Sequence, residues 1–299
     1  MPSNAPYRGR FAPSPTGPLH FGSLVAAVAS YLQAHAQSGS WLVRIEDLDP
    51  PREPPGSTEL ILRALDIHGF EYSEPVYQSA RLEHYQAVLD QLINDGLAYP
   101  CSCSRKHLQA TAPRGRNGII YPGTCRDGLP THSGPATAIR MRTNDHHTSY
   151  PDILQGQQSA HLESDIGDFL LRRGDGLFSY HLAVVVDDHD QQITEVVRGT
   201  DLIDSSFPQI ALIRALNFVP PDYMHIPVAL NAHGQKLSKQ SHAPPLNLEK
   251  PEENIYKSLK FLKQNPPEEL KSARLNQLWD WGQKHWRPQN LAGQISGAL

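Results

Sequence analysis

A strand-to-helix turn near the amino terminus carries residue types that suit the binding of an anion. The turn reads Arg10-Phe-Ala-Pro-Ser-Pro-Thr-Gly-Pro-Leu-His20-Phe-Gly22-Ser23. Backbone N–H groups at the amino terminus of a helix favour anions, and His20 would lie among them. Gly22 leaves room for a flat ring to lie against the backbone. By itself this pattern also fits a proline- and glycine-rich turn that carries a surface histidine.

A second motif, far along the chain, reads Lys236-Leu-Ser238-Lys239-Gln240. A loop with two lysines can close over a polyphosphate and neutralise the charge that develops as pyrophosphate leaves. Alone, such a run is typical of solvated surface. The two motifs in this order, each next to a predicted strand, are a specific signal for a nucleotide site. The phosphate-loop and dinucleotide-binding glycine motifs are absent, which excludes the common ATPase and dinucleotide-binding interpretations.

All three cysteines fall within one irregular segment, residues 100–134, which is rich in Gly, Pro, Arg and Ser. Cys101 and Cys103 are close enough in sequence to chelate one ion, and Cys125 lies within one loop of them. Three thiolates suit a tetrahedral zinc ion and leave a fourth ligand to be found. Since the segment has few apolar residues, we expect one structural Zn²⁺ to stabilise its fold. The alternative is three free thiols in a flexible loop.

The two polar motifs resemble the HIGH and KMSKS signatures of class I aminoacyl-tRNA synthetases, which are ligases. Longer stretches are similar to the glutamyl branch of that family, and the resemblance covers roughly residues 8–245. These stretches are Arg10–Leu24, Arg44–Arg52, Tyr180–His189 and Val197–Gly199.

The resemblance implies an ATP site built by both motifs, with Mg²⁺ arriving together with ATP. The implied catalytic residues are His20, Lys236 and Lys239, and the implied ATP-binding residues are Gly22, Ser23, Ser238 and Lys239. Ser23 stands where the first signature has its last histidine, a change that the glutamyl branch tolerates. Leu237 and Gln240 replace the Met and final Ser of the second signature, and neither position carries phosphate-binding charge.

The resemblance also implies a glutamate pocket. Glutamate presents two carboxylates and an ammonium group, so a discriminating site needs cations and an anion. Arg10 and Arg198 match the cationic positions of the family, and Arg198 is the expected partner of the γ-carboxylate because a guanidinium binds it bidentately. Glu46 suits the ammonium group, with Ser14 and Tyr180 as hydrogen-bonding groups. Without the motifs, each would be an ordinary ion pair near a sheet edge.

Two features favour the truncated paralogues of glutamyl-tRNA synthetase, which activate L-glutamate with ATP and attach it to queuosine at the wobble position of tRNA(Asp). First, 299 residues leave no room for a large anticodon-binding domain. Second, the cysteine segment resembles their zinc site, in which Tyr121 is the fourth ligand; His107 or water are the alternatives.

Other functions stay open. The main alternative is a compact glutamyl-tRNA synthetase that charges the 3′ end of tRNA(Glu). A zinc-stapled RNA-binding module without catalysis and a nucleotidyltransferase of related fold are more distant. Asp187, Asp188 and Asp190 around His189 are expected in a strand-end loop near the pocket, with a magnesium site as the alternative interpretation.

The elements that must position these residues begin with a βαβ unit, with strands at 9–12 and 41–45 around a helix. Helical spacing recurs over 57–96, 210–216, 255–262 and 275–281. Strands are predicted at 138–142, 180–186, 193–198 and 225–230. The tail after Trp286 is expected to be loosely held.

We therefore predict an α/β fold: a Rossmann-like class I synthetase catalytic core with a zinc-containing insertion and a short helical carboxy-terminal tail. The expected division is 1–99 for the first half of the catalytic domain, 100–178 for an inserted zinc-binding, acceptor-like subdomain, 179–243 for the second half with the KLSKQ loop, and 244–299 for a helical segment without an anticodon-binding domain.

Composition sets further limits. A hydrophobic content of 39% excludes a disordered chain, and no apolar run approaches the roughly 20 residues of a membrane span. The polar amino terminus and the three cysteines favour a cytoplasmic protein, which we expect to be a monomer. The charge balance, 27 − 31 = −4, excludes nucleic-acid binding by bulk electrostatics, so tRNA would need a local basic face.

Overall fold

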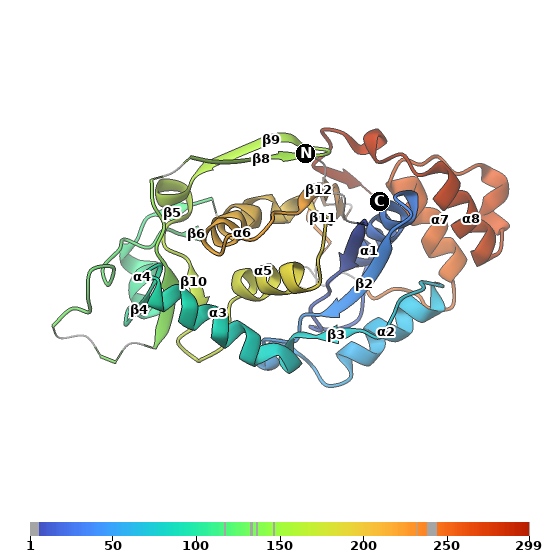
Figure 1. Ribbon diagram of the computed structural model, residues 1–299. Helices are drawn as coiled ribbons and strands as arrows, with labels where there is room; N and C mark the ends of the chain where they lie inside the picture. The colour runs from blue at the N-terminus through green and yellow to red at the C-terminus, as the bar shows by residue number, and fades with distance from the viewer. Residues whose placement is uncertain are drawn as a thin grey trace.

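The computed structural model describes residues 6–116, 118–131, 134–135, 137–145, 147–231, 233–237 and 244–298. It has the insertion with helix α4 (Arg105–Thr111) at one end and the carboxy-terminal helices α7 (Pro251–Phe261) and α8 (Leu275–His285) at the other (Figure 1). In the described part of the chain, no helix is both long and apolar enough to cross a membrane.

The predicted βαβ opening is confirmed. Strands β1 (Arg8–Phe11) and β2 (Ser40–Ile45) are parallel neighbours, joined by helix α1 (Phe21–Ala36). Helix α1 buries its apolar residues against these strands and against α7 and α8. The short strand β3 (Val76–Tyr77) extends the sheet beyond β2.

The helical pattern over 57–96 forms two helices rather than one. Helix α2 (Ser57–Ile67) ends before Gly69, and α3 (Leu82–Asn94) ends before Gly96, the predicted stop. Both glycines have positive φ values, +74° and +70°, which suit a helix end without a Cβ penalty. Strand β3 and a 3₁₀ turn at Gln78–Arg81 lie between the helices.

The second half of the chain adds strands β11 (Glu195–Gly199) and β12 (Asp222–Ile226), which are parallel neighbours. Strand β12 continues to β8 (His147–Asp152) and β9 (Gly156–His161), and helix α6 (Ile203–Ala215) packs beside β8. The two halves meet where the Thr194 N–H, just before β11, donates to the Arg8 carbonyl of β1.

The strand predicted at 180–186 is wrong, because these residues form helix α5 (Tyr180–Asp190). The Ser179 hydroxyl caps the helix by accepting from the Leu182 N–H. The apolar run of α5 is buried. A short, fully buried, valine-rich segment shows the same sequence pattern as a buried strand, so periodicity could not separate the two.

The insertion contains an antiparallel sheet in the order β10 (Leu170–Arg172), β7 (Ala138–Met141) and β4 (Ala98–Cys101). The small hairpin of β5 (Arg114–Gly115) and β6 (Gly118–Ile119) follows α4. A separate hydrophobic cluster forms around the cysteines, and its buried members are Tyr99, Cys101, Leu108, Tyr121, Cys125 and Ala138.

The expectation of a loosely held tail is wrong. Strand β14 (Ser296–Ala298) pairs in parallel with β13 (Val228–Leu230), and Trp286 and Leu291 are buried. The Trp286 indole N–H donates to Gln33 of α1. A Ser-Gly-Ala strand is held by backbone bonds and leaves no hydrophobic pattern in the sequence.

The domain boundaries stay predictions. One hydrophobic cluster includes Leu89, Leu171 and Val185, which belong to three different predicted segments. The cores of these segments are therefore continuous in space.

Candidate active site

A cavity of about 660 Å³ opens between the two halves of the chain. This volume is within the range of pockets for small ligands. The predicted site residues that line it are Arg10, Ser14, His20, Ser23, Glu46, Tyr180, Arg198 and Lys236. Residues from β1, α1, α5, β11 and the position directly after β2 thus converge on one space, although they are far apart in sequence.

His20 is the N-cap of α1, as the turn predicts. Its Nδ1 accepts from the Ser23 backbone N–H at 3.2 Å, and the Ser23 hydroxyl lies 3.2 Å from Nε2. A Cβ on Gly22 would come within 3.2 Å of the His20 ring and 3.7 Å of the Leu237 carbonyl oxygen. A Cβ here would therefore crowd the His20 ring, whereas with the Leu237 carbonyl it would make only an ordinary van der Waals contact.

The second motif is described up to Leu237. The Lys236 ammonium forms an ion pair with Asp201 at 2.5 Å, on a half-exposed edge of the cavity. Beyond the motif, the Leu246 N–H donates to the Leu19 carbonyl oxygen, so the chain returns to the turn before His20. Ser238 and Lys239, two predicted ATP-binding residues, lie outside the described residues.

Arg198 is buried, and its hydrogen-bond partners among the described residues are all neutral groups. Its Nε–H donates to His225 Nε2 at 3.1 Å, and Nη1 donates to the Tyr180 hydroxyl at 3.2 Å. Nη2 donates to Ser206 Oγ at 2.8 Å and to the Leu202 carbonyl at 3.4 Å. Within the described part of the chain, no carboxylate forms an ion pair with Arg198. A buried guanidinium in this situation favours an anionic ligand.

Arg10 differs from Arg198, because its charge is already balanced. Its Nε lies 3.1 Å from Asp188 Oδ1, and Nη2 lies 3.4 Å from Oδ2 of the same carboxylate. Burial acts to raise the pKa of Asp188, but Arg10 and Arg44 outweigh it and hold that pKa below its usual range. Of the two arginines predicted for glutamate, Arg198 is thus the one that has no counter-charge among the residues that the structure describes.

Glu46 lines the cavity close to Arg44, with 3.6 Å between Glu46 Oε1 and Arg44 Nη2. Burial raises the pKa of Glu46 to about 7, although Arg44 and Arg10 act to lower it. A cationic group that entered the cavity beside Glu46 would favour the ionised carboxylate.

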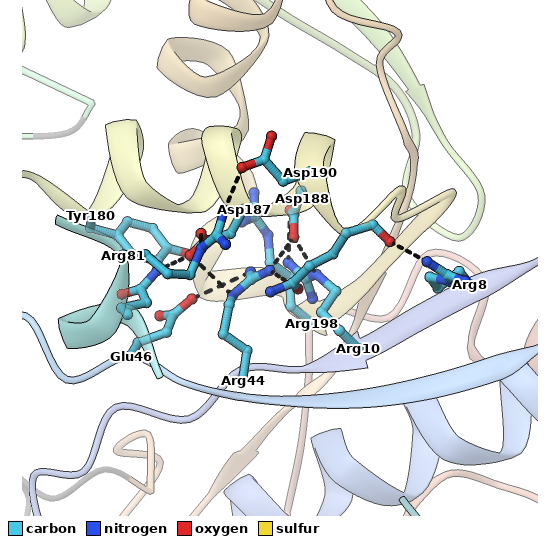
Figure 2. Close-up of polar contacts among 12 residues, drawn as sticks. Arg8, Arg10, Arg44, Glu46, Arg81, Tyr180, Asp187, Asp188, Asp190 and Arg198 are labelled. Carbon is cyan, nitrogen blue, oxygen red and sulfur yellow. Dashed lines mark hydrogen bonds and ion pairs between the residues drawn. The ribbon is translucent and has the colours of Figure 1, made fainter. Parts of the chain in front are cut away.

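The three aspartates lie in the last turn of α5, so the expected strand-end loop is wrong. Figure 2 shows their carboxylates facing arginines of β1, of β2 and of the 3₁₀ turn at Gln78–Arg81. Asp187 pairs with Arg81 at 2.6 Å, and Asp188 pairs with Arg44 at 2.8 Å. Asp190 also pairs with Arg81. A helix carboxyl end disfavours carboxylates, and these arginines compensate. Among the described residues these aspartates form no metal-ligand group.

Sequence reasoning assigned no role to Arg44, His225 or Asp152. Arg44 and Glu46 are two positions apart in the 40–46 stretch, so alternation along a strand places them on one face. That spacing was a usable signal. The buried pair of His225 and Asp152 is brought together by β12 and β8, and nothing local in the sequence marks it.

The cysteines converge as predicted. The sulfurs of Cys101, Cys103 and Cys125 lie within 4.8 Å of one another. Cys103 and Cys125 Sγ are 3.7 Å apart, and the Tyr121 hydroxyl is 3.4 Å from the sulfurs of Cys101 and of Cys103. In a tetrahedral zinc site, sulfur ligands are about 3.8 Å apart and an oxygen ligand lies about 3.5 Å from each sulfur. The donor set fits such an ion, whereas His107 is exposed and outside the group.

Residues 7–264 match the family model of tRNA synthetases class I (E and Q), catalytic domain, and the chain belongs to this family. Two curated relatives are both named glutamyl-Q tRNA(Asp) synthetase. The protein of Dechloromonas aromatica is 52% identical over 286 residues, and that of Chromobacterium violaceum is 49% identical over 285 residues. Each alignment covers 95% of both chains. The class I fold predicted from the two motifs is confirmed.

Among solved structures, the chain is similar to a glutamate tRNA ligase from Elizabethkingia meningosepticum in complex with its amino acid. The TM-score is 0.80 at 24% identity, and the alignment covers 98% of this chain and 67% of that one. This likeness supports the fold.

Proposed function

We propose that the protein activates L-glutamate with ATP as glutamyl-adenylate and transfers the glutamyl group to queuosine at the wobble position of tRNA(Asp). The observation that carries this proposal is the buried Arg198 in a cavity that also holds Glu46 and the His20 turn. The names of the relatives, which share about half of their residues with this chain, support the same activity.

Glutamate fits this cavity by charge. Its γ-carboxylate becomes the counter-ion of Arg198, and the Tyr180 hydroxyl donates a second hydrogen bond. The ammonium group faces Glu46, whose carboxylate has no hydrogen bond from Arg44 despite their short separation. Arg10 and Ser14 also line the cavity, on the side of the His20 turn.

Adenylation follows from placing the α-carboxylate in line with the α-phosphorus of ATP. A carboxylate oxygen forms a bond to this phosphorus, and the bond to the β-phosphate breaks to release pyrophosphate. His20, Lys236 and Lys239 stabilise the negative charge that spreads over the phosphates. Gly22, Ser23 and Ser238 hold the nucleotide, and Mg²⁺ bound with ATP would neutralise part of the phosphate charge.

Transfer completes the reaction. A ring hydroxyl of queuosine attacks the carbonyl carbon of the adenylate and loses its proton, and the carbon–oxygen bond to AMP breaks. The product is a glutamyl ester on the modified base. No covalent intermediate with the protein is needed, so the cavity has to provide position and charge only.

We also propose that Cys101, Cys103, Cys125 and Tyr121 hold one structural Zn²⁺. The match of their spacing to a tetrahedral site supports this assignment. Such an ion would tie α4 and the hairpin that follows it to β4 in the 100–178 subdomain. We place the protein in the cytoplasm as a monomer, with ATP, glutamate and tRNA as its partners.

The test is acylation with ATP and labelled glutamate, offered queuosine-containing tRNA(Asp), queuosine-free tRNA(Asp) and tRNA(Glu) in parallel. We expect label on the first RNA only. Label on tRNA(Glu) would favour the compact glutamyl-tRNA synthetase. Absence of both pyrophosphate exchange and acylation would leave an RNA-binding module.

A further inference from the structure

Behind Arg198 lies a buried pair of residues that the proposed chemistry does not use. His225 on β12 and Asp152 on β8 are both fully buried. His225 Nδ1 is 2.5 Å from Asp152 Oδ2, and His225 Nε2 is 3.1 Å from the Arg198 Nε. The three side chains form a continuous carboxylate–imidazole–guanidinium chain that ends at the cavity.

The protonation state of these three side chains follows from which of their atoms can donate and which can accept a hydrogen bond. The guanidinium is always a donor, so His225 Nε2 must carry a lone pair. The proton of the neutral ring is therefore on Nδ1, and Asp152 accepts it. Asp152 also accepts from the backbone N–H groups of Leu154, Gln155 and His225, which fixes its orientation. The carboxylate thus selects the only tautomer that can accept from Arg198.

The bond from Nε determines which edge of the guanidinium faces a ligand. Nη2 is occupied by Ser206 and Leu202, and Nη1 donates to Tyr180. A guanidinium has five N–H groups, so one N–H on Nη1 remains without a partner among the described residues. Since Tyr180 accepts from Arg198, its own O–H is available as a second donor. This corner of the cavity therefore offers two donors side by side, which suits a carboxylate and disfavours an amide N–H₂.

We propose that Asp152 and His225 are positioning residues that hold Arg198 in this orientation and thereby set the preference for a γ-carboxylate over a γ-carboxamide. This proposal rests on the proposed function, in which Arg198 binds the γ-carboxylate of glutamate. Without the acceptor on His225, the guanidinium loses its Nε partner, and the charge of Asp188, which already acts on Arg198, attracts it elsewhere.

Three variants separate positioning from packing. In H225M the side chain has a similar size but no comparable acceptor. In H225Q the Oε1 atom can replace Nε2 as the acceptor, so this variant is the matched control. In D152N the shape is kept, but the amide N–H₂ donates to Nδ1 and forces the other tautomer, in which Nε2–H opposes Arg198.

The measurement is ATP–pyrophosphate exchange with glutamate and with glutamine. For H225M and D152N we expect the KM for glutamate to rise about tenfold to a hundredfold, the range seen when the hydrogen-bond partners of metal ligands are removed. The kcat and the KM for ATP should change by less than about threefold, and the preference for glutamate over glutamine should fall in parallel. H225Q should recover most of the affinity. In the H225M background, D152N should add little, because the acceptor is already lost.

Thermal unfolding of each variant provides the folding control. An unchanged KM in a folded H225M, or equal losses in H225M and H225Q, would overturn the proposal in favour of a packing role. The tautomer can also be read in the resting protein from the ¹⁵N shifts of His225, with Nδ1–H expected in the wild type and Nε2–H in D152N. A wild-type Nε2–H tautomer would overturn the proposal independently of substrate. If ATP–pyrophosphate exchange by the wild-type protein does not depend on added glutamate, the proposed function itself is refuted.

Discussion

The affinity for glutamate is expected to fall as the pH drops below about 7, because Glu46 must be ionised to bind the ammonium group. Burial raises the pKa of Glu46 to about 7 in the free protein, with Arg44 and Arg10 opposing the shift. The neutral carboxyl therefore dominates below that pH. Only the ionised form attracts the ligand ammonium, so binding at acid pH requires loss of a proton.

The size of the effect follows from linkage. For one proton released on binding, the apparent dissociation constant is multiplied by 1 + 10^(pKa − pH), which is about 11 at pH 6 and about 1.1 at pH 8 for a pKa of about 7. Affinity should thus weaken about tenfold over this range, or ~1.4 kcal/mol.

The assay is titration calorimetry of L-glutamate against the resting protein between pH 6 and pH 8, in buffers of different ionisation enthalpy so that proton release is counted. E46Q keeps the shape and cannot ionise, so its affinity should be low and independent of pH. Glu195 is the matched control, because burial also raises its pKa to about 7 while it lies outside the cavity, bonded to Tyr7. E195Q should keep the wild-type slope.

The reasoning is refuted if wild-type affinity is flat across this range, or if the slope persists in E46Q. If the pH dependence of glutamate affinity disappears in E195Q instead, the titrating group is Glu195, which lies outside the cavity. Either result would also remove Glu46 as the partner of the ammonium group.

Three further predictions can be tested with standard assays. In R198K, the KM for glutamate should rise at least about a hundredfold in pyrophosphate exchange while the KM for ATP is kept, since lysine cannot reproduce the fork of donors; an unchanged KM would contradict the assignment. In K239A, the rate of exchange should fall with little change in glutamate affinity by calorimetry; a normal rate would exclude that lysine. Removal of metal by a chelator, or C125S, should lower the melting temperature by several degrees, and equal stability with and without zinc would argue against a structural ion.

The parts of the fold that follow from local pattern could be predicted. The βαβ opening was found because the apolar spacing of α1 and the proline- and glycine-rich turn before it are local features. The same applies to the convergence of Cys101, Cys103 and Cys125, whose short separations limit where they can go. Helix α5 was missed since its apolar run is buried and valine-rich. Strand β14 was missed because its pairing with β13 depends on backbone groups.

In the candidate site, the sequence predicts which residues line the cavity but not how their side chains are paired. Arg10 and Arg198 were both predicted as cations for glutamate, and both line the cavity. Sequence motifs could not show which of the two is paired with a carboxylate. The difference comes from the last turn of α5, which brings Asp188 to Arg10. If residues 180–186 formed a strand, as the sequence predicts, Asp188 would not lie in the last turn of a helix beside Arg10.

The same geometry explains how an acidic chain can hold an anion. With a formal net charge of −4, the protein as a whole repels an anionic ligand. At the cavity, however, Asp187, Asp188 and Asp190 are directed to Arg10, Arg44 and Arg81, while Arg198 is bonded to a neutral histidine, a phenol, a serine and a carbonyl. Coulomb interactions fall with distance and are strongest where water is excluded. One buried cation that has no counter-ion in the described part of the chain therefore outweighs exposed acids that solvent screens. Selectivity for the ligand therefore depends on which arginine the helix leaves unpaired, and the total charge of the chain has little influence on it.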